Sequence, residues 1–188
     1  ILQPHRERTI QRMKAQKTVL CIQDGSDLNY SPLERCEGLG FIGTNQTGKQ
    51  SKGLHLHSTF AVTSSGLPLG VLRAECTARE QRSQEDRRAL SAIPIEEKNT
   101  FSWIQGVRDC MEIKQLMPHT SLISVMDREA DFFEIFDDQR RKSSRVDLLI
   151  RAQHNRKTMG EHKLFEEVMQ SPVQSRISIK IPRQSARV

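Results

Sequence analysis

The sequence has no apolar run long enough to cross a membrane, since no stretch approaches the roughly 20 consecutive apolar residues that a spanning helix needs. It also lacks the basic stretch, apolar run and small-residue cleavage site that together mark a signal peptide. We therefore expect a soluble, cytoplasmic protein without a membrane partner.

Cysteine is scarce as well. The four cysteines, Cys21, Cys36, Cys76 and Cys110, include no C-x-x-C pair. This spacing argues against a zinc site and against a disulfide scaffold. We expect reduced thiols, two of them in the core.

The charge of the chain is unevenly distributed. Its 188 residues carry a formal net charge of +6, and residues 139–188 alone hold 12 Lys and Arg against 4 Asp and Glu. Clustered cations suggest a polyanionic partner, nucleic acid first, because phosphate contacts gain affinity from released counterions. A solvated basic surface is the alternative. A second basic cluster lies near the start of the chain, at Arg6, Arg8, Arg12, Lys14 and Lys17.

The first half of the chain predicts a helix over residues 4–15 and then three strands. The apolar run 18–23 reads as a buried strand that ends on Asp24, where turn residues follow. Residues 37–53 hold five of the ten glycines and are expected to form a loop. Alternation over 54–62, a Ser-Ser-Gly turn and the run 67–76 predict a β-hairpin.

The second half alternates helices with strands. After an exposed charged segment over 77–92, the periodicity predicts helices over 96–117, 128–141 and 164–169 and strands over 121–126 and 146–151, with new β structure from Arg176. Trp103 and the aromatic group Phe132, Phe133 and Phe136 are expected in the core. The element order predicts an α/β fold, a mixed five-stranded sheet with flanking helices.

Two of the predicted strands run onto an aspartate, Asp24 and Asp127. Ligands gather at the carboxyl ends of strands in open α/β sheets, so neighbouring strands would bring both carboxylates into one cleft. Paired carboxylates repel each other, and a hard cation such as Mg²⁺ relieves the repulsion. Two such ions about 3.5–4 Å apart polarise the attacking and leaving oxygens of a phosphodiester. The alternative is that these aspartates only form turns or cap helices, as Asp127 would do for the helix that follows it.

Six stretches carry a resemblance to a known family. In chain order they read VLCIQDGSDLNY, GLGFIGT, GLHLHSTFAVTSSGLPLGVL, EEKNTFSWI, SVMDREADFFEIF and LLIRAQHNRK. They are similar to the catalytic core of the insertion-sequence-four family of cut-and-paste DDE transposases, relatives of the transposon-five transposase. The resemblance implies a ribonuclease H-like fold, three carboxylates that bind two Mg²⁺ or Mn²⁺ ions, and double-stranded DNA as partner, both transposon ends and target. It also implies a homodimer in the intact synaptic complex and a location at the bacterial nucleoid.

The resemblance assigns roles residue by residue. Asp24 and Asp127 match the first and second catalytic, metal-binding aspartates. The positions that match DNA-contacting residues are Arg128, Arg151, Arg156 and Lys157. Gln153 stands where the family has a Lys, and Gly25 and Ser26 stand where it more often has two threonines, so these positions depart from its pattern.

No residue of this chain matches the third catalytic acid, a glutamate that the family carries on a helix beyond a β-strand insertion. Glu166 and Glu167 read as exposed positions on a short helix, and Glu129 and Asp131 as the first turn of another. Because the chain begins at Ile1 and residues 177–182 read as a strand just begun, we expect a fragment. Residues 1–170 would be part of the catalytic core and 171–188 the start of the insertion. The fragment alone is expected to be inactive in strand transfer.

Other motifs are weaker. His55 and His57 share a strand face, as a metal pair would, but no third soft ligand follows, which favours a structural or DNA-facing role. The stretch 43–50 lacks the Ser or Thr of a phosphate-binding loop. A non-catalytic DNA-binding module from a decayed or domesticated transposase is the main alternative function, and an unrelated α/β phosphotransferase is the third.

Overall fold

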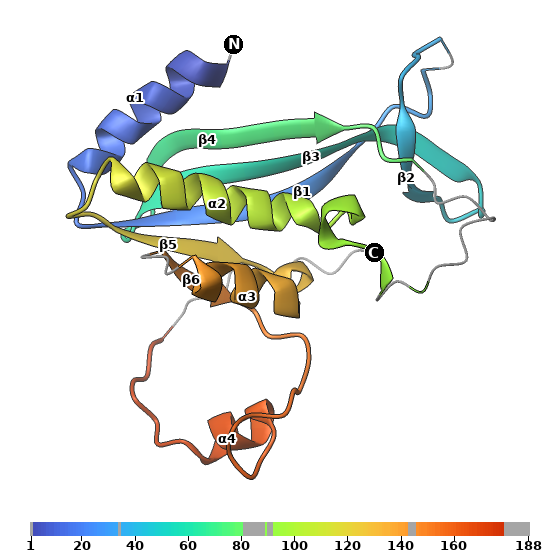
Figure 1. Ribbon diagram of the computed structural model, residues 1–188. Helices are drawn as coiled ribbons and strands as arrows, with labels where there is room; N and C mark the ends of the chain where they lie inside the picture. Colours follow the sequence, from blue (N-terminus) through green and yellow to red (C-terminus); the bar gives the residue numbers. More distant parts are fainter. Residues whose placement is uncertain (1, 34, 81–88, 90–91, 143–145, 179–188) are drawn as a thin grey trace. The chain divides into compact units, whose positions relative to one another are not determined.

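The computed structural model describes residues 2–33, 35–80, 89, 92–142 and 146–178 (Figure 1). These fall into two compact units, Ile1–Gln153 and His154–Val188, and each is described by itself. No helix within the described ranges is both long enough and apolar enough to cross a bilayer.

The first unit is a mixed α/β structure built on one six-stranded sheet. Its strands follow the order β2-β3-β1-β5-β6, with β4 paired to β3. The central strand β1 is antiparallel to β3 on one side and parallel to β5 on the other, and β6 continues the parallel half. The strands are β1 Thr18–Asn29, β2 Gly40–Thr44, β3 Gln50–Thr63, β4 Pro68–Thr77, β5 Ser121–Met126 and β6 Val146–Ile150.

The expectation of five strands was wrong by one, because part of the glycine-rich segment is a strand. β2 pairs with the first residues of β3, which begins at Gln50 rather than at Leu54. Between them, residues 45–49 form a hairpin turn, in which the Asn45 side chain accepts hydrogen bonds from the backbone N–H groups of Thr47 and Lys49. Gly48 takes the left-handed conformation that this turn requires, with φ at 78°. Strand pairing has outweighed the local preference for a loop.

Helices cover one face of this sheet, which we call the covered face. Helix α1 (Leu2–Lys14) packs on β4, and α2 (Phe101–Gln115) runs along the sheet against β1, β3, β5 and β6 (Figure 1). Alternate residues of β1 point to this face and are buried, among them Val19, Cys21 and Gln23. The expectation of reduced thiols is confirmed: all four cysteines are free, and Cys21 and Cys110 are buried in this core.

The opposite face, which we call the open face, keeps apolar residues partly in water. On β1, Ile22 is 37% exposed, and on β6, Leu149 is 59% exposed. Ile123 and Val125 of β5 lie on the same face and are half-buried. On the open face, aliphatic side chains of β1, β5 and β6 thus remain partly accessible to solvent.

The two longer predicted helices differ from the structure at their starts. Residues 95–97 form a separate 3₁₀ turn, η2 (Ile95–Glu97), because Lys98 is extended, and α2 then begins at Phe101. Trp103 is buried in the core as expected. Likewise η3 (Arg128–Ala130) is separated from α3 (Phe133–Arg141) by Asp131 and an extended Phe132.

This interruption changes which side chains of α3 are buried. Ile135 is buried, whereas Phe133 is 70% exposed and Phe136 is 36% exposed, so the expectation that both phenylalanines belong to the core was wrong. Phe132 packs against the core only in part. A continuous helix over 128–141 would have had a different phase, which is why its periodicity misassigned these residues.

The second unit contains the short helix α4 (Leu164–Gln170), as expected. Its first turn is held by the Asn155 side chain, which accepts a hydrogen bond from the backbone N–H of Phe165, and by a bridge between Lys157 and Lys163. Residues 176–178 are not in a strand, and the rest of the predicted new strand lies outside the described residues. Most of the predicted exposed segment 77–92 also lies outside the described residues. The boundary predicted at residue 170 stays a prediction.

Helix α2 approaches the sheet closely at Gly106. A Cβ atom there would lie 2.1 Å from Oε1 of Gln23, whose Nε2 donates a hydrogen bond of 2.9 Å to Oγ of Ser124. Glycine therefore lets α2 pack directly on the buried amide that joins β1 to β5.

Gly106→Ala is expected to destabilise the protein by about 1–3 kcal/mol, the usual cost of overpacking, even though alanine is the better helix former. Urea unfolding measures this cost. The variant Gln23→Ala removes the clashing amide, so the double variant should be more stable than the sum of the two single effects predicts. Strict additivity would contradict this packing.

Candidate functional site

Asp24 lies on β1, and Asp127 directly follows β5, the parallel neighbour of β1. The parallel pairing ends with Ile22 and Val125, and continuing that register by two residues puts Asp24 level with Asp127. Asp127 is still extended (φ −81°, ψ −170°), so the strand alternation holds through it. Both residues are exposed and follow buried neighbours, Gln23 and Met126, which places both carboxylates on the open face. Adjacent strands are roughly 4.8 Å apart.

The expectation that Asp24 ends its strand was wrong. β1 continues to Asn29, because β3 is long enough to pair with it as far as Gly53. What ends near Asp24 is the parallel half of the sheet, since β5 stops at Met126. Asp24 therefore lies where β1 begins to extend past the end of β5.

Each carboxylate also has a local structural role. Oδ1 of Asp24 accepts a hydrogen bond of 3.0 Å from the backbone N–H of Gly25. Oδ1 of Asp127 accepts one of 2.8 Å from the backbone N–H of Glu129 and so caps η3. The capping role considered for Asp127 is therefore present. It occupies one oxygen of the carboxylate and leaves Oδ2 for another ligand.

Two of the four predicted DNA-contacting residues, Arg128 and Arg151, belong to the backbone around Asp127. Arg128 directly follows Asp127 and is exposed. Arg151 follows the last residue of β6, and its backbone N–H donates a hydrogen bond of 3.2 Å to the carbonyl of Met126. Since Met126 pairs with Ile150, Arg151 stands level with Asp127. Arg156 and Lys157 belong to the second unit, where Lys157 is exposed and Arg156 is half-buried.

The other acids occupy different environments. Glu129 lies in the first helical turn after Asp127, as expected, and is exposed. Asp131, expected in the same turn, instead follows η3: it is 6% exposed, and its Oδ2 accepts a hydrogen bond of 2.7 Å from the backbone N–H of Gln153. Glu166 is exposed on α4, while Glu167 is half-buried and accepts a hydrogen bond from the Thr158 hydroxyl.

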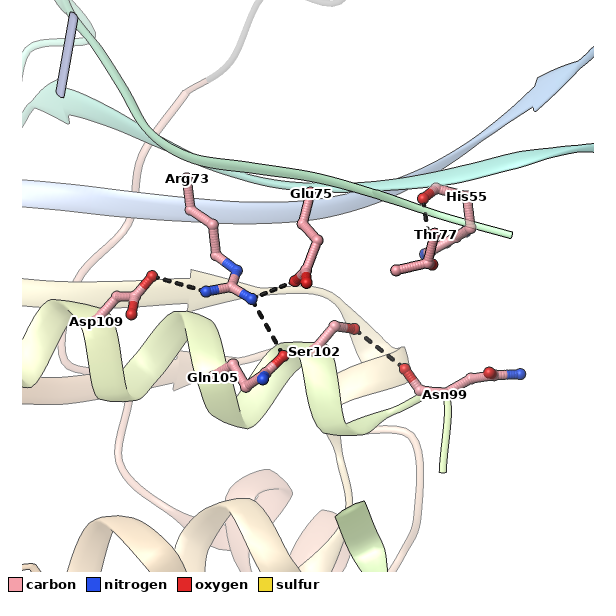
Figure 2. A network of polar contacts seen from close by, with 8 residues as sticks. All are labelled: His55, Arg73, Glu75, Thr77, Asn99, Ser102, Gln105 and Asp109. Atoms are coloured by element: carbon pink, nitrogen blue, oxygen red, sulfur yellow. Dashed lines mark hydrogen bonds and ion pairs between the residues drawn. The ribbon is translucent and has the colours of Figure 1, made fainter. Parts of the chain in front are cut away.

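The covered face carries a second polar cluster, between the β3–β4 hairpin and α2 (Figure 2). The Arg73 guanidinium donates to Asp109 and Gln105 of α2 and to Glu75 of its own strand. Burial acts to lower the pKa of Arg73, but its hydrogen bonds and ion pairs with Asp109 and Glu75 outweigh burial and raise it. This network fastens α2 to β4 through a charged side chain.

His55 and His57 belong to this covered face. Nδ1 of His55 lies 2.7 Å from Oδ1 of Asp27, and its ring packs over Gly25. His57 is 2% exposed, and its ring meets that of Trp103 edge to face, with centroids 4.7 Å apart. Among the described residues neither ring nitrogen of His57 has a hydrogen-bond partner. Burial, with the nearby His55 and Arg73, lowers the pKa of His57 to about 4.

A cavity of about 270 Å³ adjoins these histidines, lined by both of them and by Glu75, Ser102 and Gln105 among others. The part of the chain that the structure describes contains no cluster of three or more His, Cys, Asp or Glu side chains arranged to hold a metal. The histidine pair lies on the covered face, opposite the two aspartates, which fits the structural role, one of the two roles favoured for it over a metal pair.

Sequence reasoning missed Arg73, Asp109 and the buried position of Asp131. Arg73 and Asp109 lie 36 residues apart and meet only through the packing of α2 on β4. For Asp131 the sequence carries one weak signal. Asp127 and Asp131 flank the three residues that form the 3₁₀ turn Arg128–Ala130.

Comparison of the sequence with protein-family models and with curated proteins found no match.

The depressed pKa of His57 should make stability depend on pH. An unfolded chain takes up a proton on this histidine near pH 6.5, whereas the folded chain does so only near pH 4. The free energy of unfolding should therefore fall as the pH drops from about 6.5 towards 4, by up to about 3 kcal/mol.

Urea unfolding at a series of pH values measures the slope of the free energy of unfolding against pH. His57→Gln, which cannot be protonated, should show a flatter dependence over this interval whatever its stability at neutral pH. Equal slopes for the variant and the natural chain would refute the assignment.

Proposed function

We propose that this chain is a fragment of a DDE-type DNA transposase with a ribonuclease H-like core, whose intact form cleaves and joins phosphodiesters with the help of divalent metal ions. The observation that carries the proposal is that Asp24 and Asp127 each lie two residues beyond the last pair of the parallel strands β1 and β5, both exposed, and that Arg151 directly follows β6, the next strand. A six-stranded mixed sheet with flanking helices is compatible with that fold.

The residues present fit part of a metal site. Mg²⁺ and Mn²⁺ take oxygen ligands, and two exposed carboxylates on one face supply them. Each carboxylate has Oδ1 bonded to a backbone N–H, which fixes its orientation and leaves Oδ2 to bind a cation. When bound, two metal ions would stabilise the charge on the attacking and leaving oxygens of the phosphodiester.

The chain's own residues would bind and orient the DNA. Arg128 follows Asp127 in the chain, and the backbone N–H of Arg151 bonds to Met126, the residue before Asp127. Both arginines are exposed, so their guanidinium groups can neutralise phosphates close to the carboxylates. Arg156 and Lys157 add two cations in the second unit. The excess of Lys and Arg over residues 139–188 supports a backbone-binding role without sequence readout.

The chain alone is proposed to be inactive in strand transfer, because only two of the three carboxylates are assigned. The same fact favours the second candidate, a non-catalytic DNA-binding module, since none of the described acids completes a three-ligand group. Metal binding distinguishes the two candidates: a transposase fragment should retain weak affinity for Mn²⁺ at the two aspartates, and a decayed module has no need of it.

Mn²⁺ should bind this chain weakly, and either Asp24→Asn or Asp127→Asn should weaken binding by about tenfold or more, since each removes an ionic oxygen ligand. Electron paramagnetic resonance of free Mn²⁺ measures the affinity. Asp27→Asn is the matched control, because Asp27 lies on the same strand but bonds to His55 on the covered face. An equal loss in the control, or no Mn²⁺ binding by the natural chain, would contradict the metal site.

Arg151→Gln should weaken binding to a short DNA duplex and lower the slope of log affinity against log salt by about 0.9, the value for one lost phosphate contact. Fluorescence anisotropy at several salt concentrations measures both. Lys114→Gln is the control. Lys114 donates to the carbonyls of Pro118 and Thr120, just before β5 begins, and so lies at the opposite end of β5 from Asp127. A slope unchanged in Arg151→Gln would exclude a phosphate contact at this position.

A further inference from the structure

Asp131 is the most buried carboxylate in the described part of the chain. Its side chain is 6% exposed, and Oδ2 accepts a hydrogen bond of 2.7 Å from the backbone N–H of Gln153. Burying an ionised carboxylate is costly unless hydrogen bonds compensate, and a short bond from a backbone N–H to a charged acceptor is among the stronger ones. The backbone N–H of Gln153 therefore supplies one of the hydrogen bonds that a carboxylate buried at this position needs.

One short turn connects Asp131 rigidly to Asp127. The backbone N–H of Asp131 donates to the carbonyl of Arg128, and that of Ala130 donates to the carbonyl of Asp127, each at 3.2 Å. Asp127 caps the start of the turn through its own side chain. The two aspartates are thus the two ends of η3, one facing the solvent and the other facing inward.

The segment 151–153 is tied to this turn and its strand at two points. The backbone N–H of Arg151 donates to Met126, the residue before Asp127, and the backbone N–H of Gln153 donates to Asp131. Since β6 ends at Ile150, no further strand pairing holds this segment. The bond to Asp131 lies two residues beyond Arg151 and restrains the backbone on its far side.

We infer that Asp131 is a positioning residue: its carboxylate fixes the segment after β6 so that Arg151 stays beside Asp127. The role assigned to Arg151, holding a DNA phosphate, rests on the proposed function, whereas the restraint itself does not. Asp131 touches neither DNA nor metal in this account and acts through the backbone of Gln153.

Amide hydrogen exchange on the full 188-residue chain tests the restraint. In Asp131→Ala the exchange rate of the Gln153 amide should rise at least tenfold, while the amides of β1 should keep their protection. Asp131→Asn retains an acceptor oxygen and should give a smaller increase. Asp109→Ala, which breaks the ion pair with Arg73, is the matched control and should leave the Gln153 amide unchanged. An unchanged rate in Asp131→Ala would overturn the inference, and if that variant does not fold, an unchanged rate in Asp131→Asn would do so.

A double-variant cycle on DNA affinity tests the action through Arg151. Asp131→Ala should lower affinity for a short duplex by nearly the same factor as Arg151→Gln, and the double variant should lose little more than either one. A merely structural role would give independent, multiplying losses and would overturn the positioning role. If the natural chain does not bind the duplex, the proposed function fails and the positioning role fails with it, whereas the exchange experiment still reports on the restraint.

Discussion

The register between β1 and β5 is the constraint on which the rest of the first unit depends. β1 pairs with an antiparallel strand on one side and a parallel one on the other, so its alternation decides what each side of the sheet presents. On the covered face this alternation buries Cys21 and Gln23 beneath α2, and on the open face it presents Ile22 and Asp24. The hydrogen bond between Gln23 and Ser124 joins the two strands under the helix. The two aspartates are level because this register is fixed.

The two faces differ in a way that amphipathic patterns do not anticipate. The covered face is rich in polar groups, since His57, Thr59 and Gln23 are all buried there, whereas the open face keeps aliphatic side chains partly in water. Of these three, Gln23 donates a hydrogen bond to Ser124, whereas neither ring nitrogen of His57 has a partner among the described residues. The contacts that specify how α2 packs on β4 are those of the Arg73 guanidinium with Asp109 and Gln105.

Much of the element order could be predicted from the sequence, because long apolar runs such as 121–126 and the hairpin turn at residues 64–66 carry strong local signals. The errors lie where long-range pairing overrides local preference. β1 continues past Asp24, Gly25 and Ser26, which read locally as a turn, because β3 supplies hydrogen bonds along the whole strand. Phe133 and Phe136 were misplaced because a break at Asp131 shifts the helical phase. Strand-end reasoning predicted that Asp24 and Asp127 lie together, although only β5 ends at this level and β1 continues to Asn29. The link from Asp131 to Gln153 joins residues 22 apart and has no periodic signature.

The alternation of β1 has a consequence for how the chain can change in length. The Asp24 side chain is exposed. Its neighbours Gln23 and Gly25 face the covered side, where Gly106 of α2 lies close to Gln23 and the His55 ring lies close to Gly25, so both positions have little room. A single-residue insertion or deletion earlier in this strand would turn every later side chain to the other face. It would place the carboxylate under α2 and a buried amide in water. The length of β1 therefore cannot change ahead of Asp24 without exchanging its two faces, whereas a change of length within the turn at residues 45–49 leaves the register of β1 unaltered.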